Sequence, residues 1–302
     1  MLLFWTFLIG IAGATFAIAV SYVSHWYPPE KQGYVLGIVG LGNIGTAVSG
    51  FIVPSMVSKF GLSWTFWGSA VLMGLMTVVF WLFTKEAPFL NKETTFKEAL
   101  SVMKYRPLWI LSVFYFLTFG GFVAFSLYLP TLLQEIYHFS VISAGLKTAG
   151  FVVIATFIRP LGGYLADRFG AKKILMILFA GIAVNVVLIP FMAVNFVIFS
   201  IAFLTLALFL GAGNGAVFKL VPNVSPGKTG ASAGIIGAIG GIGGFALPLV
   251  LGMTKDITGN YMLGFTILSI YSFICFITTI REISNTKMSS KEKNVNALPS
   301  IQ

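Results

Sequence analysis

The sequence predicts an all-α membrane protein, a bundle of about nine transmembrane helices, on three observations. Of its 302 residues, 57% are hydrophobic and 9% are charged, whereas a soluble domain carries roughly 25% charged residues. The mean hydropathy of +0.94 leaves too little polar surface to cover the apolar residues in water, so lipid must be the remaining solvent. The apolar residues form continuous runs without polar alternation, which excludes a transmembrane barrel and leaves helices.

Nine apolar runs are long enough to cross a hydrocarbon core of ~30 Å as helices. They comprise residues 2–23, 33–57, 62–84, 108–129, 143–164, 174–190, 196–218, 230–252 and 261–280. No positive residue precedes the first run, so it is a poor candidate for a signal peptide. The polar segment 283–302 is expected to be a disordered tail.

Basic residues gather in alternate loops between these runs. The loops on one side carry Lys85, Lys92, Lys97, Lys104, Arg106, Arg168, Lys172, Lys173, Lys228, Arg281, Lys287, Lys291 and Lys293. The opposite loops carry Lys59 and Lys255. The positive-inside rule therefore predicts a multi-pass protein of the cell membrane with a cytoplasmic C-terminus. The net charge of +10 belongs to solvated loops, and we expect no nucleic acid as a partner.

The residue types that carry enzymatic or metal chemistry are sparse. Cys275 is the single cysteine, so no intrachain disulfide can form. His25 and His138 have no further ligands at metal-binding spacing, and we find no nucleophile–base pair or phosphate loop. We therefore expect no enzyme activity, no cofactor and no metal.

A glycine-rich stretch occurs twice in the chain. The copy PEKQGYVLGIVGLGN begins at Pro29 and the copy PGKTGASAGIIGAIGG begins at Pro226, 197 residues later. Transporters built from two related halves show such internal repeats, and this spacing matches six spans with their loops. Counted from the C-terminus, the copies fall in spans five and eleven of twelve. The repeat therefore predicts that three more spans precede Met1 in the intact transporter.

The motif GGYLADRFGAKK, residues 162–173, lies in a basic loop between two runs. It resembles the loop signature of the major facilitator superfamily. A carboxylate there can cap a neighbouring helix N-terminus and pair with a basic residue across the loop. We interpret the motif as a conformational latch and not as a substrate site. Its members are Gly163, Asp167, Arg168, Gly170, Lys172 and Lys173.

Arg159 lies eight residues before this loop aspartate, inside an apolar run. A helical rise of 1.5 Å per residue places it ~12 Å from the loop, near the membrane midplane. An arginine at that depth costs at least about 2.5–3.5 kcal/mol, and none of the nine runs contains an aspartate or glutamate. The sequence therefore favours an anion site over an ion pair, whose carboxylate would have to come from the spans expected before Met1.

Other candidate residues lie at a similar depth. Asn43 is ten residues into its run, as is its repeat partner Gly240, and Tyr115 precedes Phe119 by one turn. Asparagine and tyrosine supply neutral hydrogen-bond donors, and phenylalanine supplies a flat face. Six glycines crowd residues 234–244, where close helix packing and approach to a small ligand both remain open.

Together, GLGNIGTAVSGFIVP, GIIGAIGGIGGFALP, IRPLGGYLADRFG and GAGNGAVFKLVP closely resemble the nitrate/nitrite porter family of the major facilitator superfamily. The resemblance implies twelve spans and a positively charged central site for nitrate or nitrite. It implies that Arg159 is one of two substrate arginines and that Asn43 is the signature asparagine. It also implies the remaining substrate-binding roles: Tyr115 as donor, Phe119 as aromatic wall, and Gly237 and Gly240 in the second signature. The spans with the second arginine lie outside this chain.

The expected organisation follows from this resemblance. Residues 1–84 form spans four to six of an N-terminal half, 85–106 a cytoplasmic central loop, 107–282 a C-terminal six-helix half and 283–302 the tail. The expected function is alternating-access transport of nitrate inward or nitrite outward by a monomer, in nitrate assimilation. The alternatives are a carrier for another small monovalent anion and an inactive transporter fragment. Exchange and proton symport both remain open.

Overall fold

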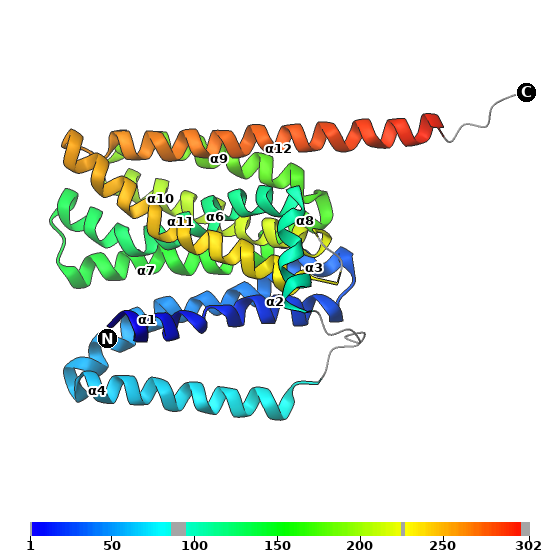
Figure 1. Ribbon diagram of the computed structural model, residues 1–302. Helices are drawn as coiled ribbons and strands as arrows, with labels where there is room; N and C mark the ends of the chain where they lie inside the picture. The colour runs from blue at the N-terminus through cyan, green and yellow to red at the C-terminus, as the bar shows by residue number, and fades with distance from the viewer. Residues whose placement is uncertain (1, 86–94, 225–226, 297–302) are drawn as a thin grey trace, which may run out of the picture.

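The computed structural model describes residues 2–85, 95–224 and 227–296, and all regular secondary structure in them is helical (Figure 1). The helices are α1 Leu2–Ile11, α2 Ala14–Trp26, α3 Gln32–Val39, α4 Ile44–Phe83, α5 Phe96–Leu100, α6 Arg106–Tyr137, α7 Val141–Phe157, α8 Arg159–Phe169, α9 Ala171–Met192, α10 Phe196–Leu220, α11 Thr229–Thr258 and α12 Met262–Asn296. The all-α membrane fold predicted from the sequence is thereby confirmed.

Eight helical segments of the described residues are long and apolar enough to cross a membrane, and they match eight of the nine predicted runs. The run at residues 2–23 is not among them, because a turn at Ala12 and Gly13 divides it into α1 and α2. The amides of Gly13 and Thr15 donate to carbonyls three residues earlier, at 3.0 and 3.2 Å. This tighter spacing interrupts the α-helix.

The helix α4 contains a break at Gly61, where φ is 80° and ψ is 168°. This conformation lies in the left-handed half of backbone space, which favours glycine. The two parts of α4 consequently run back along each other, and the second lies at the edge of the bundle (Figure 1). None of the residues in the most apolar 18-residue window of the segment Ser55–Phe83 is buried.

The C-terminal segment differs from the sequence expectation. Helix α12 continues to Asn296, where the sequence predicted a disordered tail from residue 283. Each residue added to an existing helix gains a hydrogen bond without a new nucleation cost, so a polar continuation of an apolar span can stay helical. Residues 297–302 lie outside the described part of the chain, as do residues 86–94 of the central loop, including Lys92.

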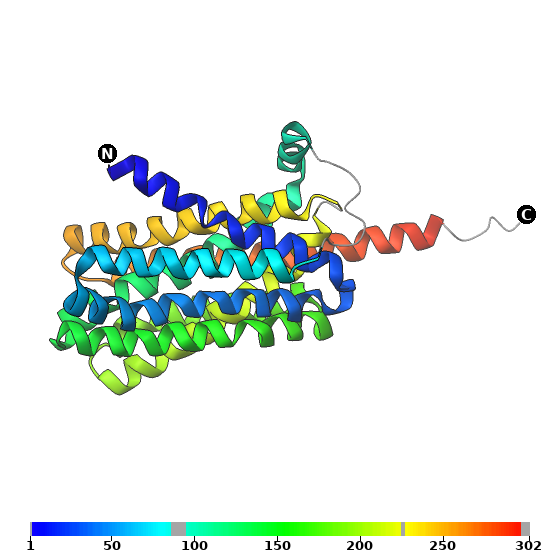
Figure 2. The ribbon, with the colours of Figure 1, turned by 90° about the horizontal axis from the view of Figure 1, so that it is seen from below.

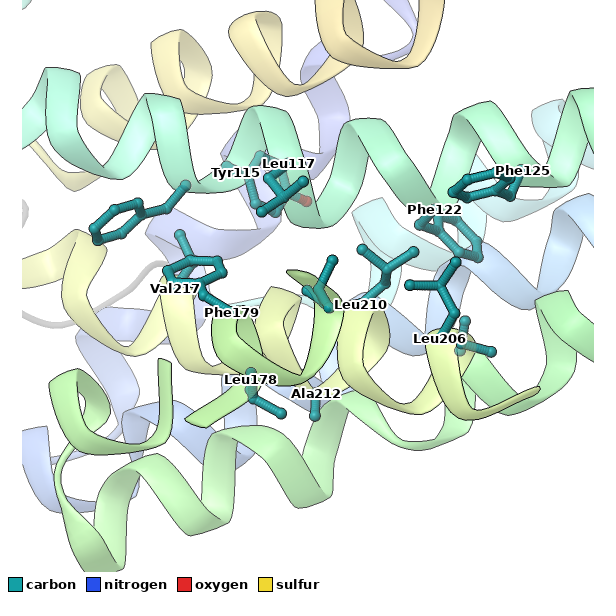
Figure 3. Packing of buried hydrophobic residues seen from close by; sticks show 14 of the residues in the cluster. Tyr115, Leu117, Phe122, Phe125, Leu178, Phe179, Leu206, Leu210, Ala212 and Val217 are labelled. Carbon is teal, nitrogen blue, oxygen red and sulfur yellow. The ribbon is translucent and has the colours of Figure 1, made fainter. Parts of the chain in front are cut away.

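Helix α10 lies at the centre of the packing, with α6, α7, α8 and α9 around it, while α6 packs along α11 and α9 along α12. Helix α3 packs on α8, and α2 packs on α11. The two views show these helices running side by side along one direction (Figures 1 and 2). The buried cluster in Figure 3 fills the space between α6, α9 and α10 with residues such as Leu117, Phe179 and Leu210.

Polar contacts tie three helices together at the end where α6 finishes. The Glu135 carboxylate of α6 pairs with Lys255 of α11 and accepts from the hydroxyl of Tyr261, just before α12. Burial, followed by this hydrogen bond, raises the pKa of the Tyr261 hydroxyl, which therefore stays protonated as the donor. The connection between α8 and α9, with its basic residues, lies at the opposite end of the bundle, on the side towards which α12 extends (Figure 1).

Candidate functional site

Arg159 occupies the junction between α7 and α8. Helix α7 ends at Phe157, and the following Pro160 has no N–H to donate to the carbonyl of Thr156. The Arg159 side chain is only 2% exposed. One terminal nitrogen donates to the Gly40 carbonyl at 3.4 Å, and the other donates to the Tyr115 hydroxyl at 3.2 Å. The Nε atom is buried without a hydrogen-bond partner in the described structure.

The charge of Arg159 is not balanced by a carboxylate in the described residues. Among residues 2–85, 95–224 and 227–296 no ion pair involves it, and its hydrogen-bond partners there are a carbonyl and a phenol. The ring centroids of Phe16 and Phe119 lie 5.9 and 6.0 Å from the guanidinium carbon, within the range of a cation–π attraction. An unpaired buried charge is costly, so this guanidinium provides a strong driving force for anion binding.

A cavity of about 610 Å³ adjoins this arginine. It lies between α2, α6, α11 and the 3₁₀ turn Gly40–Asn43, and the aromatic pair Tyr115 and Phe119 forms part of its wall. The two rings are stacked, with centroids 4.9 Å apart and planes 2° apart. Arg159 lies behind Tyr115 and does not itself line the cavity. The lining residues are Gly10, Gly13, Ala14, Thr15, Phe16, Ala17, Asn43, Tyr115, Phe119, Ala233, Gly234, Gly237, Ala238 and Gly241.

The first glycine-rich copy contains a 3₁₀ turn at the site instead of forming one continuous α-helix. The 3₁₀ turn Gly40–Asn43 separates α3 from α4, and such a turn inside a helix often marks a functional position. At Gly40 an added Cβ would lie 2.6 Å from Arg159 Nε, so only glycine leaves room for the guanidinium. The Nδ2 atom of Asn43 is buried and has no hydrogen-bond partner within the described chain.

The second glycine-rich copy has two faces with different roles. A Cβ at Gly240 would lie 2.5 Å from the Tyr115 ring, and one at Gly243 would lie 3.1 Å from Gly120 Cα. These glycines therefore let α11 pack closely on α6. Gly237 and Gly241 line the cavity with no atom within 4 Å of an added Cβ. The sequence left close helix packing and approach to a small ligand open for these glycines. One face of α11 packs closely on α6, and the other face forms an open wall of the cavity.

We predict that Gly240→Ala weakens anion binding although Gly240 does not line the cavity. The new methyl group displaces Tyr115, whose hydroxyl accepts the Arg159 hydrogen bond. For the nitrate uptake expected from the sequence, the half-saturating concentration should rise about tenfold, which corresponds to the loss of one charged hydrogen bond. Gly252→Ala, on the same helix but outside the cavity lining, is the matched control, because an added Cβ there meets only the Tyr128 hydroxyl oxygen at 3.8 Å. It should stay near the parent value. Equal half-saturation for both variants would contradict this reason.

The aspartate of the loop motif holds α3 and α8 together. The carboxylate of Asp167 accepts from the amides of Gly33 and Tyr34 at 3.0 and 2.8 Å, at the N-terminus of α3. Lys219 of α10 pairs with the same carboxylate at 2.6 Å and also donates to the Pro29 carbonyl. The side chain of Asp167 is 8% exposed, so this ion pair is largely shielded from solvent.

Of the remaining motif residues, Gly163 belongs to the same contact and the others lie elsewhere. Gly163 meets Gly33 backbone to backbone, and Gly170 turns the chain between α8 and α9 with φ of 92°. Arg168 donates to Tyr164 on its own helix at 3.3 Å, and Lys172 donates to the Glu282 carbonyl at 3.1 Å. For Lys173 the structure shows a backbone bond to Gly170 at 3.1 Å. Among the motif residues, Asp167 therefore bonds to α3 and Gly163 packs closely against it.

Sequence reasoning missed several residues that the fold brings to the site. Phe16 and Gly40 contact Arg159, Phe218 packs edge-on against Tyr115 with centroids 4.8 Å apart, and Lys219 pairs with Asp167. One signal was available for Lys219, a charged residue at the end of an apolar run. The phenylalanines carry no such signal, because 30 phenylalanines occur in the chain.

The sequence matches the family description "Major Facilitator Superfamily" over residues 1–248 and again over 115–294. The chain belongs to the major facilitator superfamily. It is 39% identical to the "Nitrite extrusion protein" of Bacillus subtilis (strain 168) over 274 residues, which are 91% of this chain and 69% of that protein. It is 37% identical to the "Probable nitrate transporter NarT" of Staphylococcus haemolyticus, with 92% of this chain and 72% of that protein covered.

Solved structures of this superfamily show the same fold. The human organic anion transporter MFSD10 matches 87% of this chain and 67% of its own, with 16% identity and a TM-score of 0.71. The proton:xylose symporter XylE matches 88% of this chain and 67% of its own, with 14% identity and a TM-score of 0.69. By its family match and these relatives, the chain is a multi-pass membrane transporter related to nitrate and nitrite transporters, and not an enzyme, as the sequence predicted.

Proposed function

We propose that this major facilitator transports nitrate, nitrite or both across the cell membrane by alternating access, with Arg159 as the anion-binding group. The observation that carries the proposal is a 2% exposed guanidinium with no carboxylate partner among the described residues. A single charge of this kind matches one monovalent anion, whereas a divalent anion calls for more cationic charge. The relatives named for nitrate and nitrite support the same substrate class.

The surroundings of Arg159 suit a small planar anion. A guanidinium offers N–H donors in one plane, which can bind two oxygens of a flat anion side by side. Phe16 and Phe119 place ring faces near this plane, and Asn43 offers an unused amide donor at the cavity wall. We assign contact with the anion at the cavity wall to Asn43, Tyr115 and Phe119, with Gly237 in the same wall and Gly240 in support of Tyr115. Arg159 supplies the positive charge from behind Tyr115, to which it is hydrogen-bonded, and reaches the anion as the helices rock.

The shape of the molecule favours a state closed at the Asp167 end. There Asp167 and Gly163 hold α8 against α3, while a second cavity of about 660 Å³ lies at the opposite end. That cavity is bounded by α4, α6 and α7, with Thr46, Ser55 and Ser126 among its polar wall residues. We infer that the helices of residues 2–83 and those of 106–282 rock about the arginine, and that the Asp167 contacts release in the other state. On the positive-inside rule, the closed end is cytoplasmic.

We expect labelled nitrate to enter proteoliposomes containing the purified protein, with saturation and with competition by unlabelled nitrite. Acetate at the same concentration should compete poorly, because its methyl group replaces one oxygen of the planar anion. Counterflow into nitrate-loaded vesicles measures the activity whether the mechanism is exchange or symport. Equal competition by acetate would favour a carrier for another monovalent anion. Absence of both uptake and nitrate binding would favour an inactive transporter fragment.

A further inference from the structure

The hydroxyl groups of two buried threonines lack the hydrogen bond to a helix carbonyl that other hydroxyl side chains in the bundle make. Ser112, Ser126 and Thr148 each donate their hydroxyl to the carbonyl four residues earlier, as hydroxyl side chains in helices commonly do. Thr118 and Thr156 are fully buried, yet their Oγ1 atoms have no hydrogen-bond partner in the described structure. Asn214 is 1% exposed, and both its amide nitrogen and its amide oxygen are unpartnered within the same residues.

Each of these three residues lies one helical turn from a residue of the arginine site. Thr118 follows Tyr115 by three residues on α6, and Thr156 precedes Arg159 by three at the α7–α8 junction. Asn214 precedes Phe218 by four residues on α10. Side chains separated by three or four residues share a helix face. Tyr115 is hydrogen-bonded to Arg159 at 3.2 Å and packed on Phe218 at 4.8 Å, so these three helices meet at this level.

The helix directions place the three unpartnered residues in one layer. Helix α6 ends at Tyr137, whose ring packs on Phe196 at the start of α10 with centroids 5.2 Å apart. Helices α7 and α10 therefore run opposite to α6. Thr118 comes after its site residue on α6, whereas Thr156 and Asn214 come before theirs. All three are thus displaced towards the same end of the bundle, by about 4.5–6 Å.

Close helix contacts flank Asn214 on both sides. A Cβ at Gly213 would lie 2.6 Å from Thr118 Cγ2, and one at Gly215 would lie 2.7 Å from the Gly163 amide nitrogen. Helix α10 therefore touches α6 at one neighbour of Asn214 and α8 at the other. The amide lies between these contacts, on the helix face that it shares with Leu210 and Phe218. Leu210 belongs to the buried cluster drawn in Figure 3.

The chemistry of this layer identifies its occupant. Each unsatisfied buried polar group costs about 1–3 kcal/mol, so four such atoms need partners. The Asn214 oxygen requires a hydrogen-bond donor, which nitrate and nitrite lack. The Asn214 nitrogen requires an acceptor, which a bare cation lacks, and no charged side chain belongs to the set. Water supplies both functions and is the usual partner of buried polar groups.

We propose that Thr118, Thr156 and Asn214 form an internal water site one helical turn from Arg159. Its water molecules bridge the three side chains and lie close to a guanidinium that has no carboxylate partner in the described chain. They lower the cost of that buried charge when no anion is bound. The site exists in the unloaded protein and does not depend on which anion is transported.

The test is hydroxyl-radical labelling of the purified protein by X-ray pulses, read by mass spectrometry without nitrate. Radicals form from water inside the protein, so a buried residue beside bound water is labelled. Leu210, at 1% exposure, is the reporter, and Leu175, at 0%, is the equally buried control in an apolar region. We expect Leu210 to be labelled several-fold faster than Leu175. Equal rates would overturn the proposal.

The variants Thr118→Val and Thr156→Val supply a second test, because a hydrated site and a dry site predict changes of the Tm in opposite directions. Valine keeps the shape and removes the hydroxyl. If water is bound, both variants lower the Tm and slow the labelling of Leu210, because a bridging hydrogen bond is lost. In a dry site the same change removes an unsatisfied group and raises the Tm, which would refute the proposal. Thr148→Val, whose hydroxyl donates to the Ala144 carbonyl, is the control and should leave Leu210 labelling unchanged.

Discussion

Replacing Arg159 by lysine is expected to lower kcat/KM for nitrate uptake by roughly 30- to 150-fold, a loss of about 2–3 kcal/mol. Lysine keeps the positive charge but presents one point of charge in place of a planar set of donors. It cannot hold the Gly40 carbonyl and the Tyr115 hydroxyl while binding two oxygens of an anion. The measurement is the initial rate of labelled nitrate uptake per molecule of reconstituted transporter, over a range of nitrate concentrations.

The matched control for this variant is Arg168→Lys on the same helix. Arg168 lies near the far end of α8, and its side chain donates to Tyr164 on the same helix. Its replacement removes a bond on the helix surface and leaves the arginine site intact, so uptake should stay within a factor of two of the parent. If Arg159→Lys also retained uptake at that level with equal protein in the membrane, Arg159 would be a structural residue.

The second large effect is expected for Gly163→Ala, which should reduce the maximal transport rate more than tenfold. A shift of the equilibrium between the two transport states lowers the population of a state that every cycle must pass through. The new methyl group would occupy the space of the Gly33 carbonyl group. Helices α3 and α8 must then separate, and the bonds from the amides of Gly33 and Tyr34 to Asp167 are lost. The state closed at this end is disfavoured, and the cycle stalls in the other state.

Pulsed electron–electron double resonance between spin labels on α3 and α8 measures this separation of the two helices directly. In the variant, the distance distribution should shift to longer values, and nitrate should no longer restore the short distance. Gly150→Ala on α7 is the control, because an added Cβ there meets no atom within 4 Å. A short distance and a parental transport rate in Gly163→Ala would show that this backbone contact is not part of the transport cycle.

The membrane class and most of the spans were predictable because their cause is local. A window of about 20 residues either contains enough apolar side chains to cross the bilayer or does not. Eight of nine runs were located in this way. The turn at Ala12 and Gly13, which divides the first run into α1 and α2, was not predictable in this way, because it leaves the average apolarity of the run unchanged. The continuation of α12 to Asn296 was missed for a related reason, since polar composition alone does not end a helix that has already formed.

The sequence by itself determined that Arg159 is an intramembrane cation without an acidic residue in the predicted spans, since charge and depth can be read along one helix. Only the tertiary structure decided what surrounds that cation. Gly40 and Tyr115 reach it across 119 and 44 residues of chain, and Lys219 meets Asp167 from another helix. The tertiary structure also decided that Gly240 packs against Tyr115 while Gly237 faces the cavity. The physical reason is that these contacts depend on how the helices rotate and cross, which the summed packing of many distant side chains selects and no single segment encodes.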